Sequence, residues 1–427
     1  MLLLFIWCAY TAPFLRFINT DYILSTLLYL SIFAIYYKSY CLRFRTKPLS
    51  YILFAFSVWY VVICVKYSAI VNVDFGLVYS FLLCHVAFCL YKEKEFFIYF
   101  EKVLVHLTLI SLVVWGLGLI AIQPMRALFD IIALWKPEPG GTLYGNIIFV
   151  SLGNRYSMGI FRNPGFTWEA GRFACFLVIG LFVSLLLHNM EIKKNKSFWI
   201  FLVGLISTVS TTGVGACVGV ALLYFSNKGN SQKMLCMVLS ILLLPFIWSL
   251  EFVSGKIFDN IDLETEIYNM GYSFSRLGTE SICPQRFTGL FLEFQNWIHD
   301  FWIGYGQKDF SYTQAELFHG YDVWLSNGLI MIFAKYGTLV GVGFYYCLFK
   351  SSSKIVHDFG YKGSFLFVLT FMLISMSYDF WSNGVFLYFV LYWLYCKYRP
   401  QCSINYTTKV LLKYYGLIRM FQFAKRR

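Results

Sequence analysis

The chain has 427 residues, of which 59% are hydrophobic and only 13% are charged, and its formal net charge is +13. A soluble domain carries about 25% charged residues, so this composition excludes a single soluble core and predicts a polytopic membrane protein. The basic residues come in short groups between apolar runs, without a basic face interleaved with aromatics, which disfavours nucleic acid as a partner. Almost all of the twelve cysteines fall in apolar runs or in their basic connections, so a disulfide framework is not expected.

The apolar runs recur at a regular spacing and have lengths near the roughly 20 residues that a helix needs to span a bilayer. The first run lacks a basic n-region and a cleavage site, so it is expected to be retained as a helix. We therefore predict an all-α polytopic membrane protein with about twelve transmembrane helices in one membrane domain, residues 1–427. The expected spans are Leu2–Ile18, Tyr22–Tyr37, Leu49–Val65, Phe75–Leu90, Val103–Ala121, Phe173–Leu187, Phe198–Ser210, Val214–Phe225, Met234–Leu250, Val323–Phe349, Ser364–Ser377 and Val385–Cys396.

Lysine and arginine collect in alternate connections, and such connections lie on the cytoplasmic side of a membrane. The basic tail, residues 398–427, lies on the same side, so both termini are expected in the cytoplasm. Within the tail, 410–421 is either an interfacial helix on anionic lipid or a basic stop signal. The basic groups are Lys38 to Lys47, Lys92 to Lys102, Lys193 to Lys196, Lys228 to Lys233 and Lys350 to Lys362.

Two long loops, residues 122–172 and 251–322, fall on the opposite, extracytoplasmic side. Their richness in aromatic residues argues against disorder, and we expect them to fold as a cap on the bundle with short helices such as 290–302. These loops carry arginines, whose planar forks match phosphate oxygens. Metal-ligand spacings and a glycine-rich phosphate loop are missing from the sequence, so neither a metal nor another cofactor is expected.

Three segments of the chain combine arginine, glycine and other polar residues near the ends of expected helices. They are Arg162-Asn163-Pro164-Gly165-Phe166-Thr167-Trp168-Glu169-Ala170, then residues 207–215, and last Arg286 with a Gly304-Tyr305-Gly306 turn, His319 and Gly337. In this order they resemble the motifs of the O-antigen polymerase and ligase superfamily. The first is similar to the family's Arg-x-x-Gly-apolar-x-x-Glu, although many relatives have Pro after the Glu. The second is similar to a signature of polar and small residues between two helices, and the third follows the order of the family's loop Arg, Gly-x-Gly, loop-end His and following Gly.

The resemblance implies a bacterial inner-membrane enzyme that polymerises surface polysaccharide, O-antigen or capsule, from an undecaprenyl-diphosphate-linked oligosaccharide. By resemblance, Arg162 and Arg286 would hold the leaving diphosphate, and His319 would take the proton from the attacking sugar hydroxyl. Such a reaction would invert the anomeric centre without a metal. Glu169, Arg172, Arg276 and Lys335 are the expected substrate-binding residues, and a chain-length regulator is a candidate partner.

Each residue also has an ordinary structural interpretation. The arginines can be solvated or paired with loop acids, His319 can be an interfacial side chain, and Lys335 can pair with Asp379 instead of touching phosphate. Two other functions stay open. A ligase that transfers the glycan to another acceptor would share these residues, whereas a glycan-lipid flippase would favour short loops.

Overall fold

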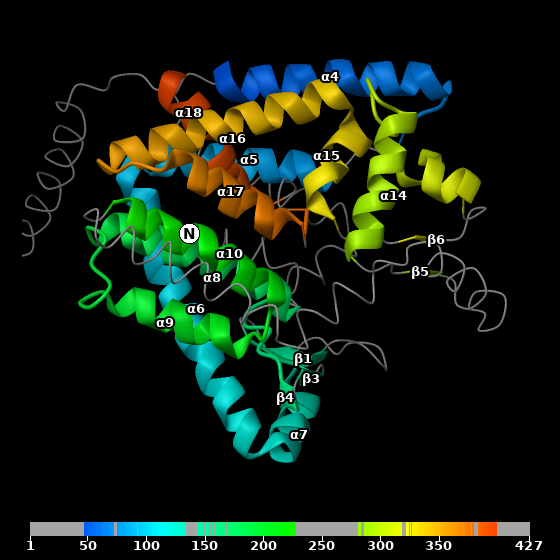
Figure 1. Ribbon diagram of the computed structural model, residues 1–427. Helices are drawn as coiled ribbons and strands as arrows, with labels where there is room; N and C mark the ends of the chain where they lie inside the picture. Colours follow the sequence, from blue (N-terminus) through cyan, green and yellow to red (C-terminus); the bar gives the residue numbers. More distant parts are fainter. Residues whose placement is uncertain are drawn as a thin grey trace, which may run out of the picture.

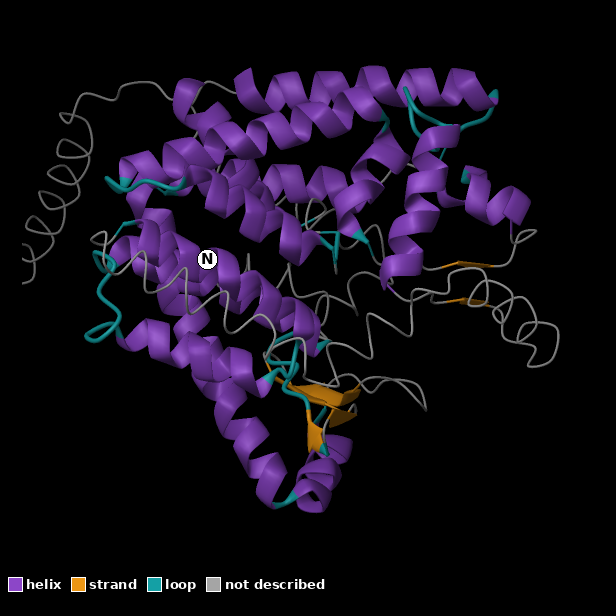
Figure 2. Ribbon diagram, in the orientation of Figure 1, coloured by secondary structure: helices purple, strands orange, loops and turns teal. Residues whose placement is uncertain are grey.

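The computed structural model describes residues 47–71, 75–91, 93–133, 143–147, 150–153, 156–157, 159–167, 169–227, 281–282, 286–317, 322–323, 325, 327–376, 378–379 and 383–398. These residues are mostly helical, as the all-α prediction requires (Figures 1 and 2). The expected spans Leu2–Ile18, Tyr22–Tyr37 and Met234–Leu250, and the tail after Tyr398, lie outside the described residues.

The helices of the bundle follow the apolar runs closely, since α5 begins and ends where the run does. Among the runs that form a single helix, the largest difference is α6, which begins ten residues before the expected span and takes Lys94 and Lys102 into the helix. The bundle helices are α4 (Lys47–Tyr67), α5 (Phe75–Leu90), α6 (Glu93–Ile120), α8 (Ala170–Leu187), α9 (Lys196–Ser207), α10 (Thr211–Ser226), α15 (Gly328–Tyr336), α16 (Thr338–Asp358), α17 (Ser364–Ser375) and α18 (Gly384–Tyr398).

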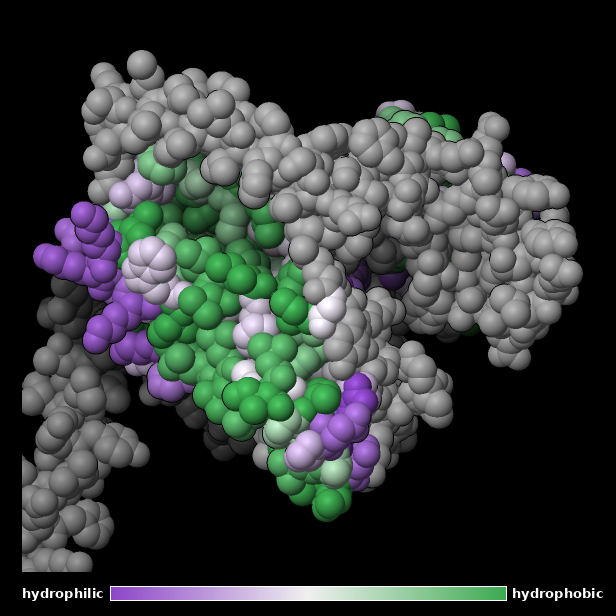
Figure 3. All heavy atoms as spheres, turned by 60° about the horizontal axis from the view of Figure 1, so that its bottom comes forward, coloured by the Kyte–Doolittle hydropathy of each residue, from purple (hydrophilic) through white to green (hydrophobic). Residues whose placement is uncertain are grey.

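Three of these helices are long and apolar enough to cross a membrane: 48–67 in α4, 94–120 in α6, and α8. Helices α9, α10 and α17 are apolar but shorter. The surfaces of α4, α6 and α9 expose large apolar side chains, as a lipid-facing surface does. Figure 3, which turns the side of α7 and α9 toward the viewer, shows a broad hydrophobic face there with hydrophilic residues gathered at its edges, whereas α4 lies on the opposite side of the bundle in Figure 1. The apolar residues exposed on these helices include Phe54, Val58, Val61, Val65, Leu109, Ile110, Val113, Leu117, Trp199, Val203 and Ile206.

Helix α8 lies at the centre of the bundle, and its side chains are buried from Ala170 to Leu186. A continuous row of apolar side chains can be buried on all sides only when other helices surround it, and α6, α9 and α10 pack directly against α8. A second part of the core is an aromatic stack in which Tyr388 of α18 lies 3.8 Å from the ring of Phe88 and 3.4 Å from that of Phe96. These contacts join α5, α6 and α18.

The connections with lysine meet at one end of the bundle, which we call the basic end. Tyr361 donates to the Asn189 side chain at 3.3 Å, and the side chain of Asn227 donates to the Lys362 carbonyl at 2.9 Å. The Lys94 ammonium lies 5.2 Å from the ring centre of Phe359. Turns 188–195 and 359–363 lie side by side at the left of Figure 1. The opposite end, where α8, α10, α15 and α18 begin, carries the family-like segments, and we call it the motif end.

The described parts of the two long loops fold on different helices. In the first loop, α7 (Ile122–Ile132) packs on the hairpin of β1 (Leu143–Ile147) and β2 (Val150–Gly153), followed by the pair β3 (Tyr156–Ser157) and β4 (Ile160–Phe161). The second loop contains α14 (Arg286–His299), η2 (Lys308–Phe310) and η3 (Thr313–Leu317). In the chain these elements come between two short strands that pair with each other in parallel. These are β5 (Ser281–Ile282) and β6 (Asp322–Val323). Helix α14 overlaps the helix expected at 290–302, but it starts earlier, at Arg286, and ends earlier, at His299.

The single span expected at Val323–Phe349 is wrong, because the chain breaks at Gly337 into α15 and α16. Gly337 has φ +83°, and the turn Trp302–Gly306 lies against the break. Tyr305 N donates to the Ala334 carbonyl and Thr338 N to the Phe301 carbonyl, both at 2.9 Å. We call this contact the glycine seam, because a Cβ on Gly304 or Gly337 would collide with the facing backbone.

The glycine seam makes a direct prediction about stability. Gly337→Ala should lower the free energy of unfolding by more than about 1 kcal/mol, because alanine at positive φ is strained and its Cβ would meet the Trp302 carbonyl. Gly343→Ala on α16 is the matched control, since a Cβ there has no neighbour within 4 Å. Thermal unfolding of the detergent-solubilised variants measures both effects. Equal stability of the Gly337→Ala variant and the wild type would contradict the seam.

Candidate functional site

The first family-like segment folds as a turn on the second. The backbone N–H of Asn163 donates to the Ser207 carbonyl at 3.0 Å, and its side-chain amide donates to the Ser207 hydroxyl at 2.9 Å. Arg162 Nε donates to the Thr208 carbonyl at 2.9 Å. Two segments separated by about forty residues of sequence are therefore fixed together at the motif end, where α9 ends and α10 begins.

Glycine is required inside this turn. Gly165 has φ +61°, and a Cβ at this position would lie 2.6 Å from the ring of Phe173. The Asn163 carboxamide oxygen accepts from Gly165 N at 2.9 Å, which closes the turn from within. The next residue, Phe166, then packs on Phe176, with ring centres 5.1 Å apart. The turn is anchored in the core of the bundle on both sides.

Glu169 and Arg172 lie where this turn enters α8. Glu169 is the N-cap residue, and its carbonyl accepts from Arg172 N and Phe173 N at 3.1 Å. Arg172 is buried in the first turn of α8 and Arg162 is half-buried, so the motif end holds two arginines and one glutamate within a stretch of eleven residues. Two buried or half-buried arginines with a glutamate close in sequence suit a site that binds an anion and sugar hydroxyls.

A second polar group lies where α14 crosses α15. Glu293 of α14 is only 1% exposed, and its carboxylate accepts from the Asn296 side chain at 3.4 Å. Asn296 is also buried, and its oxygen accepts from the Thr313 hydroxyl at 2.7 Å and from Thr313 N at 2.8 Å. The charges of Lys335 and Asp379 act on the same carboxyl. We call Glu293, Asn296, Lys335 and Asp379 the Glu293 cluster.

Burial raises the pKa of the Glu293 carboxyl to about 8, because desolvation disfavours its charged form. The Asn296 hydrogen bond and the Lys335 ammonium lower this pKa, whereas the Asp379 carboxylate raises it further. At neutral pH, Glu293 therefore carries a proton inside the motif end. A protonated carboxyl can donate a hydrogen bond, and its charge state responds to any ligand charge placed beside it.

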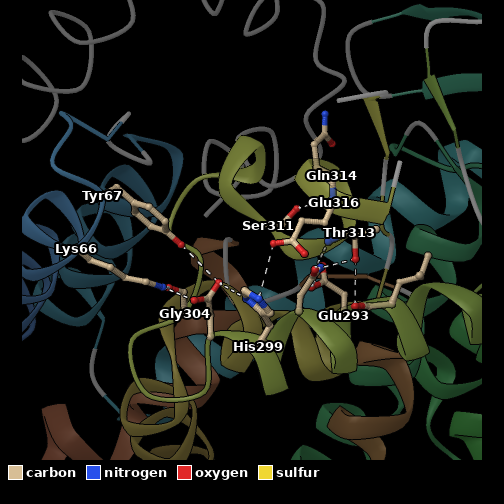
Figure 4. A network of polar contacts seen from close by, with 12 residues as sticks. Lys66, Tyr67, Glu293, His299, Gly304, Ser311, Thr313, Gln314 and Glu316 are labelled. Atoms are coloured by element: carbon tan, nitrogen blue, oxygen red, sulfur yellow. Dashed lines mark hydrogen bonds and ion pairs between the residues drawn. The ribbon is translucent and has the colours of Figure 1, made fainter. Parts of the chain in front are cut away.

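The turn after α14 is tied to the end of α4 (Figure 4). The Lys66 ammonium pairs with the Asp300 carboxylate and donates to the Gly304 carbonyl at 3.1 Å, and Tyr67 stacks on Phe310 with ring centres 4.3 Å apart. Trp59 Nε1 donates to the Ile303 carbonyl at 2.9 Å. These contacts hold the turn of the glycine seam against α4 and thereby fix the C-terminal end of α14 beside the end of α4.

The start of α18 and the residues just before it contact the surroundings of both polar groups, the Arg162 turn and the Glu293 cluster. Phe386, in its first turn, packs on Phe176 of α8 with ring centres 4.9 Å apart, and thus lies behind the Arg162 turn. A few residues earlier, the backbone at Tyr378 and Asp379 lies against Gly328, where any Cβ would collide with it. Asn327 caps α15 and also donates to the Met376 carbonyl at 3.3 Å. The connection between α17 and α18 therefore contacts α15, while the helix that follows it contacts α8.

The structure places some of the predicted site residues together. Arg162, Glu169 and Arg172 lie at the Arg162 turn, and Lys335 belongs to the Glu293 cluster together with Asp379, its expected structural partner. Arg286 is the first residue of α14. Arg276 and His319 lie outside the described residues, although His319 precedes β6 by only three positions and Arg286 follows β5 by four.

Sequence reasoning missed Glu293, Asn296, Asp300 and Lys66. One signal for Glu293 was available, since it follows Arg286 by seven residues and therefore shares a helix face with it. His299, which the sequence places beside the same turn, is exposed and stacks on Tyr312 at 5.0 Å between ring centres. Because His299 is exposed at the surface, we use it below as the experimental control for His319 and not as a catalytic residue.

Within the described ranges, no group of three His, Cys, Asp or Glu side chains could hold a metal ion. Comparison of the chain with protein-family models, with curated proteins and with solved structures finds no match.

The Glu293 cluster predicts how stability depends on pH. The folded protein keeps the Glu293 proton up to about pH 8, whereas the unfolded chain releases it near the ordinary value of 4.5. The folded state thus binds more protons in this window, and the free energy of unfolding falls as the pH rises, by at most about 1.4 kcal/mol per pH unit. Glu293→Gln, which imitates the neutral carboxyl, should flatten this fall.

Thermal unfolding of the solubilised protein between about pH 5 and about pH 8 measures the slope. The matched control is Glu191→Gln in the turn between α8 and α9, because Glu191 is exposed and its replacement should leave the slope unchanged. A wild-type slope that survives in the Glu293→Gln variant would contradict a buried, protonated Glu293.

Proposed function

We propose that this chain is a membrane-embedded polymerase of surface polysaccharide, O-antigen or capsule. It would transfer a growing undecaprenyl-diphosphate-linked glycan onto another lipid-linked repeat unit. The observation that carries the proposal is the packing of the family-like segments on one another. The Arg162 turn lies on residues 207–208, and the turn at Gly304 and Gly306 lies on Gly337. Both contacts belong to the motif end, as parts of one site would.

The side of the membrane follows from charge. The lysine-bearing turns meet at the basic end, and the positive-inside rule assigns that end to the cytoplasm. The motif end then faces the extracytoplasmic side of a bacterial inner membrane. The lipid-linked repeat units of surface polysaccharides are available on this side, and in this arrangement both termini are cytoplasmic.

The proposed chemistry is a glycosyl transfer that uses a leaving group already activated by its lipid diphosphate. The acceptor hydroxyl oxygen attacks the anomeric carbon of the donor glycan, and the bond from that carbon to the diphosphate oxygen breaks. The hydroxyl proton passes to His319, and undecaprenyl diphosphate leaves with its charge held by Arg162 and Arg286. Attack from the face opposite the diphosphate inverts the anomeric centre. Positioning and charge stabilisation can supply the catalysis without a metal.

The remaining residues would bind and orient the substrate. Glu169, at the N-terminus of α8, can accept hydrogen bonds from sugar hydroxyls, and Arg172 adds positive charge to the same turn. Arg276 would add to the diphosphate site from the same loop as Arg286. Lys335 acts on the Glu293 carboxyl of α14, so its role in phosphate binding would be indirect and would run through the position of α14.

His319 gives the sharpest test of this mechanism. A general base contributes about 10²- to 10⁴-fold to the rate, so His319→Ala should insert normally and bind lipid-linked glycan but scarcely extend it. His299→Ala is the matched control from the same loop, because His299 is exposed. The assay is extension of a lipid-diphosphate oligosaccharide by purified protein, with excess chelator present throughout.

Near wild-type extension by the His319→Ala variant would remove the proposed base, and loss of wild-type activity in chelator would replace the mechanism with a metal-assisted one. The same assay with a second, non-lipid-linked acceptor tests the polymerase assignment. Transfer to that acceptor instead of to the repeat unit would identify a ligase, which shares the donor chemistry.

A further inference from the structure

Helix α14 buries several of its polar residues and exposes several of its large apolar residues. Thr288, Leu292, Glu293 and Asn296 are fully buried on one face. The opposite face exposes large apolar side chains, and the exposure continues into the following turn. We call this row the α14 stripe; it consists of Phe291, Phe294, Ile298 and Trp302, of which Ile298 is 57% and Trp302 is 65% exposed. A helix at a water-facing surface has the reverse pattern, with polar residues outside.

The direction of α14 also differs from that of the bundle. Figure 1 shows α14 running crosswise to α4 and α16, beside the end of α4 where the Lys66 pair with Asp300 lies. Because α4 is long and apolar enough to cross the membrane, a helix crosswise at its end lies along the membrane surface. A helix of fourteen residues in this direction cannot span the bilayer, but it can rest in the interface.

The α14 stripe is continuous with surfaces that face lipid. The turn that carries Trp302 is hydrogen-bonded to the first residue of α16, since Thr338 N donates to the Phe301 carbonyl at 2.9 Å. The next residue, Leu339, is 73% exposed. On the other side, Gly306 packs on Ile63 of α4, whose neighbours Val62 and Val65 are exposed. The exposed apolar surface of α16 thus lies directly beside the turn that ends the α14 stripe, and on the α4 side the Lys66 pair with Asp300 marks the polar edge of this contact.

We infer that α14 is a monotopic interfacial helix whose stripe contacts the acyl chains of bilayer phospholipids. Burial of aromatic and aliphatic side chains at the boundary between headgroups and acyl chains stabilises such a helix, and tryptophan is enriched there. The stripe then turns the Glu293 cluster inward, away from lipid. Arg286, two helical turns before Glu293, opens this helix at the depth of the lipid headgroups. Contact of the α14 stripe with lipid does not depend on the proposed glycan chemistry.

Site-specific photo-crosslinking tests this contact. The photoreactive residue p-benzoyl-phenylalanine is introduced at Phe294, where it replaces a similar ring, and the full chain is reconstituted in phosphatidylethanolamine–phosphatidylglycerol vesicles and irradiated. Two control positions frame the result. Val58 on the exposed face of α4 is the lipid-facing reference, and Asp309 in η2 is an exposed polar position of the same loop.

Mass spectrometry of the intact protein should show a phospholipid adduct at position 294 with a yield comparable to that at position 58, and no such adduct at position 309. Loss of the adduct at 294 while it persists at 58 would overturn the inference. A covalent dimer at 294 in place of the lipid adduct would also overturn it, because a second copy of the chain would then cover the stripe.

Discussion

The close backbone approach at Gly304 and Gly337 is the constraint on which the motif end depends. A turn from the second long loop reaches the break between α15 and α16 only because neither residue carries a Cβ. That contact fixes the C-terminal end of α14 beside the end of α4, and the Lys66 pair with Asp300 holds the same turn from the α4 side. The place of Glu293 against the charges of Lys335 and Asp379 follows from the same contact.

Burial of charge at this end is costly unless several groups share it. Glu293 meets a cation, an anion and an amide, and its burial keeps a proton on the carboxyl. The Arg162 turn solves the same problem differently, since Arg162 donates to a carbonyl at the end of α9 and Asn163 satisfies the polar groups around it. Buried ionisable groups with shifted pKa values often mark functional sites, which agrees with the proposed glycan chemistry.

Much of the bundle could be predicted, because the length and hydropathy of a run determine whether it can form a spanning helix. The prediction of one continuous helix at Val323–Phe349 was wrong, because the chain breaks at Gly337, which hydropathy does not distinguish from the helical glycines that follow it. Only the neighbouring turn, brought from residues 302–306, makes Gly337 special. The start of α6 was predicted too late, because Lys94 and Lys102 suggested a polar connection before the helix.

The candidate site was predictable in its residue types but not in its arrangement. The resemblance named Arg162, Glu169 and Gly337, yet the contact of Asn163 with Ser207 and the burial of Glu293 arise from tertiary packing that no local pattern contains. Glu293 stands in an apolar helical stretch, where an acidic residue is ordinarily expected on the exposed face. In α14 the exposed face is apolar, so the usual expectation would place Glu293 on the exposed face, whereas it is buried.

The most direct test of the account is the binding of a short prenyl diphosphate, compared with the corresponding monophosphate, to the purified protein by titration calorimetry. If the motif end is one site for a lipid diphosphate, the wild type should prefer the diphosphate. Both Arg162→Ala and Arg286→Ala should lose that preference, although the two arginines come from different loops. A preference that survives in either variant would contradict a single diphosphate site built from both loops.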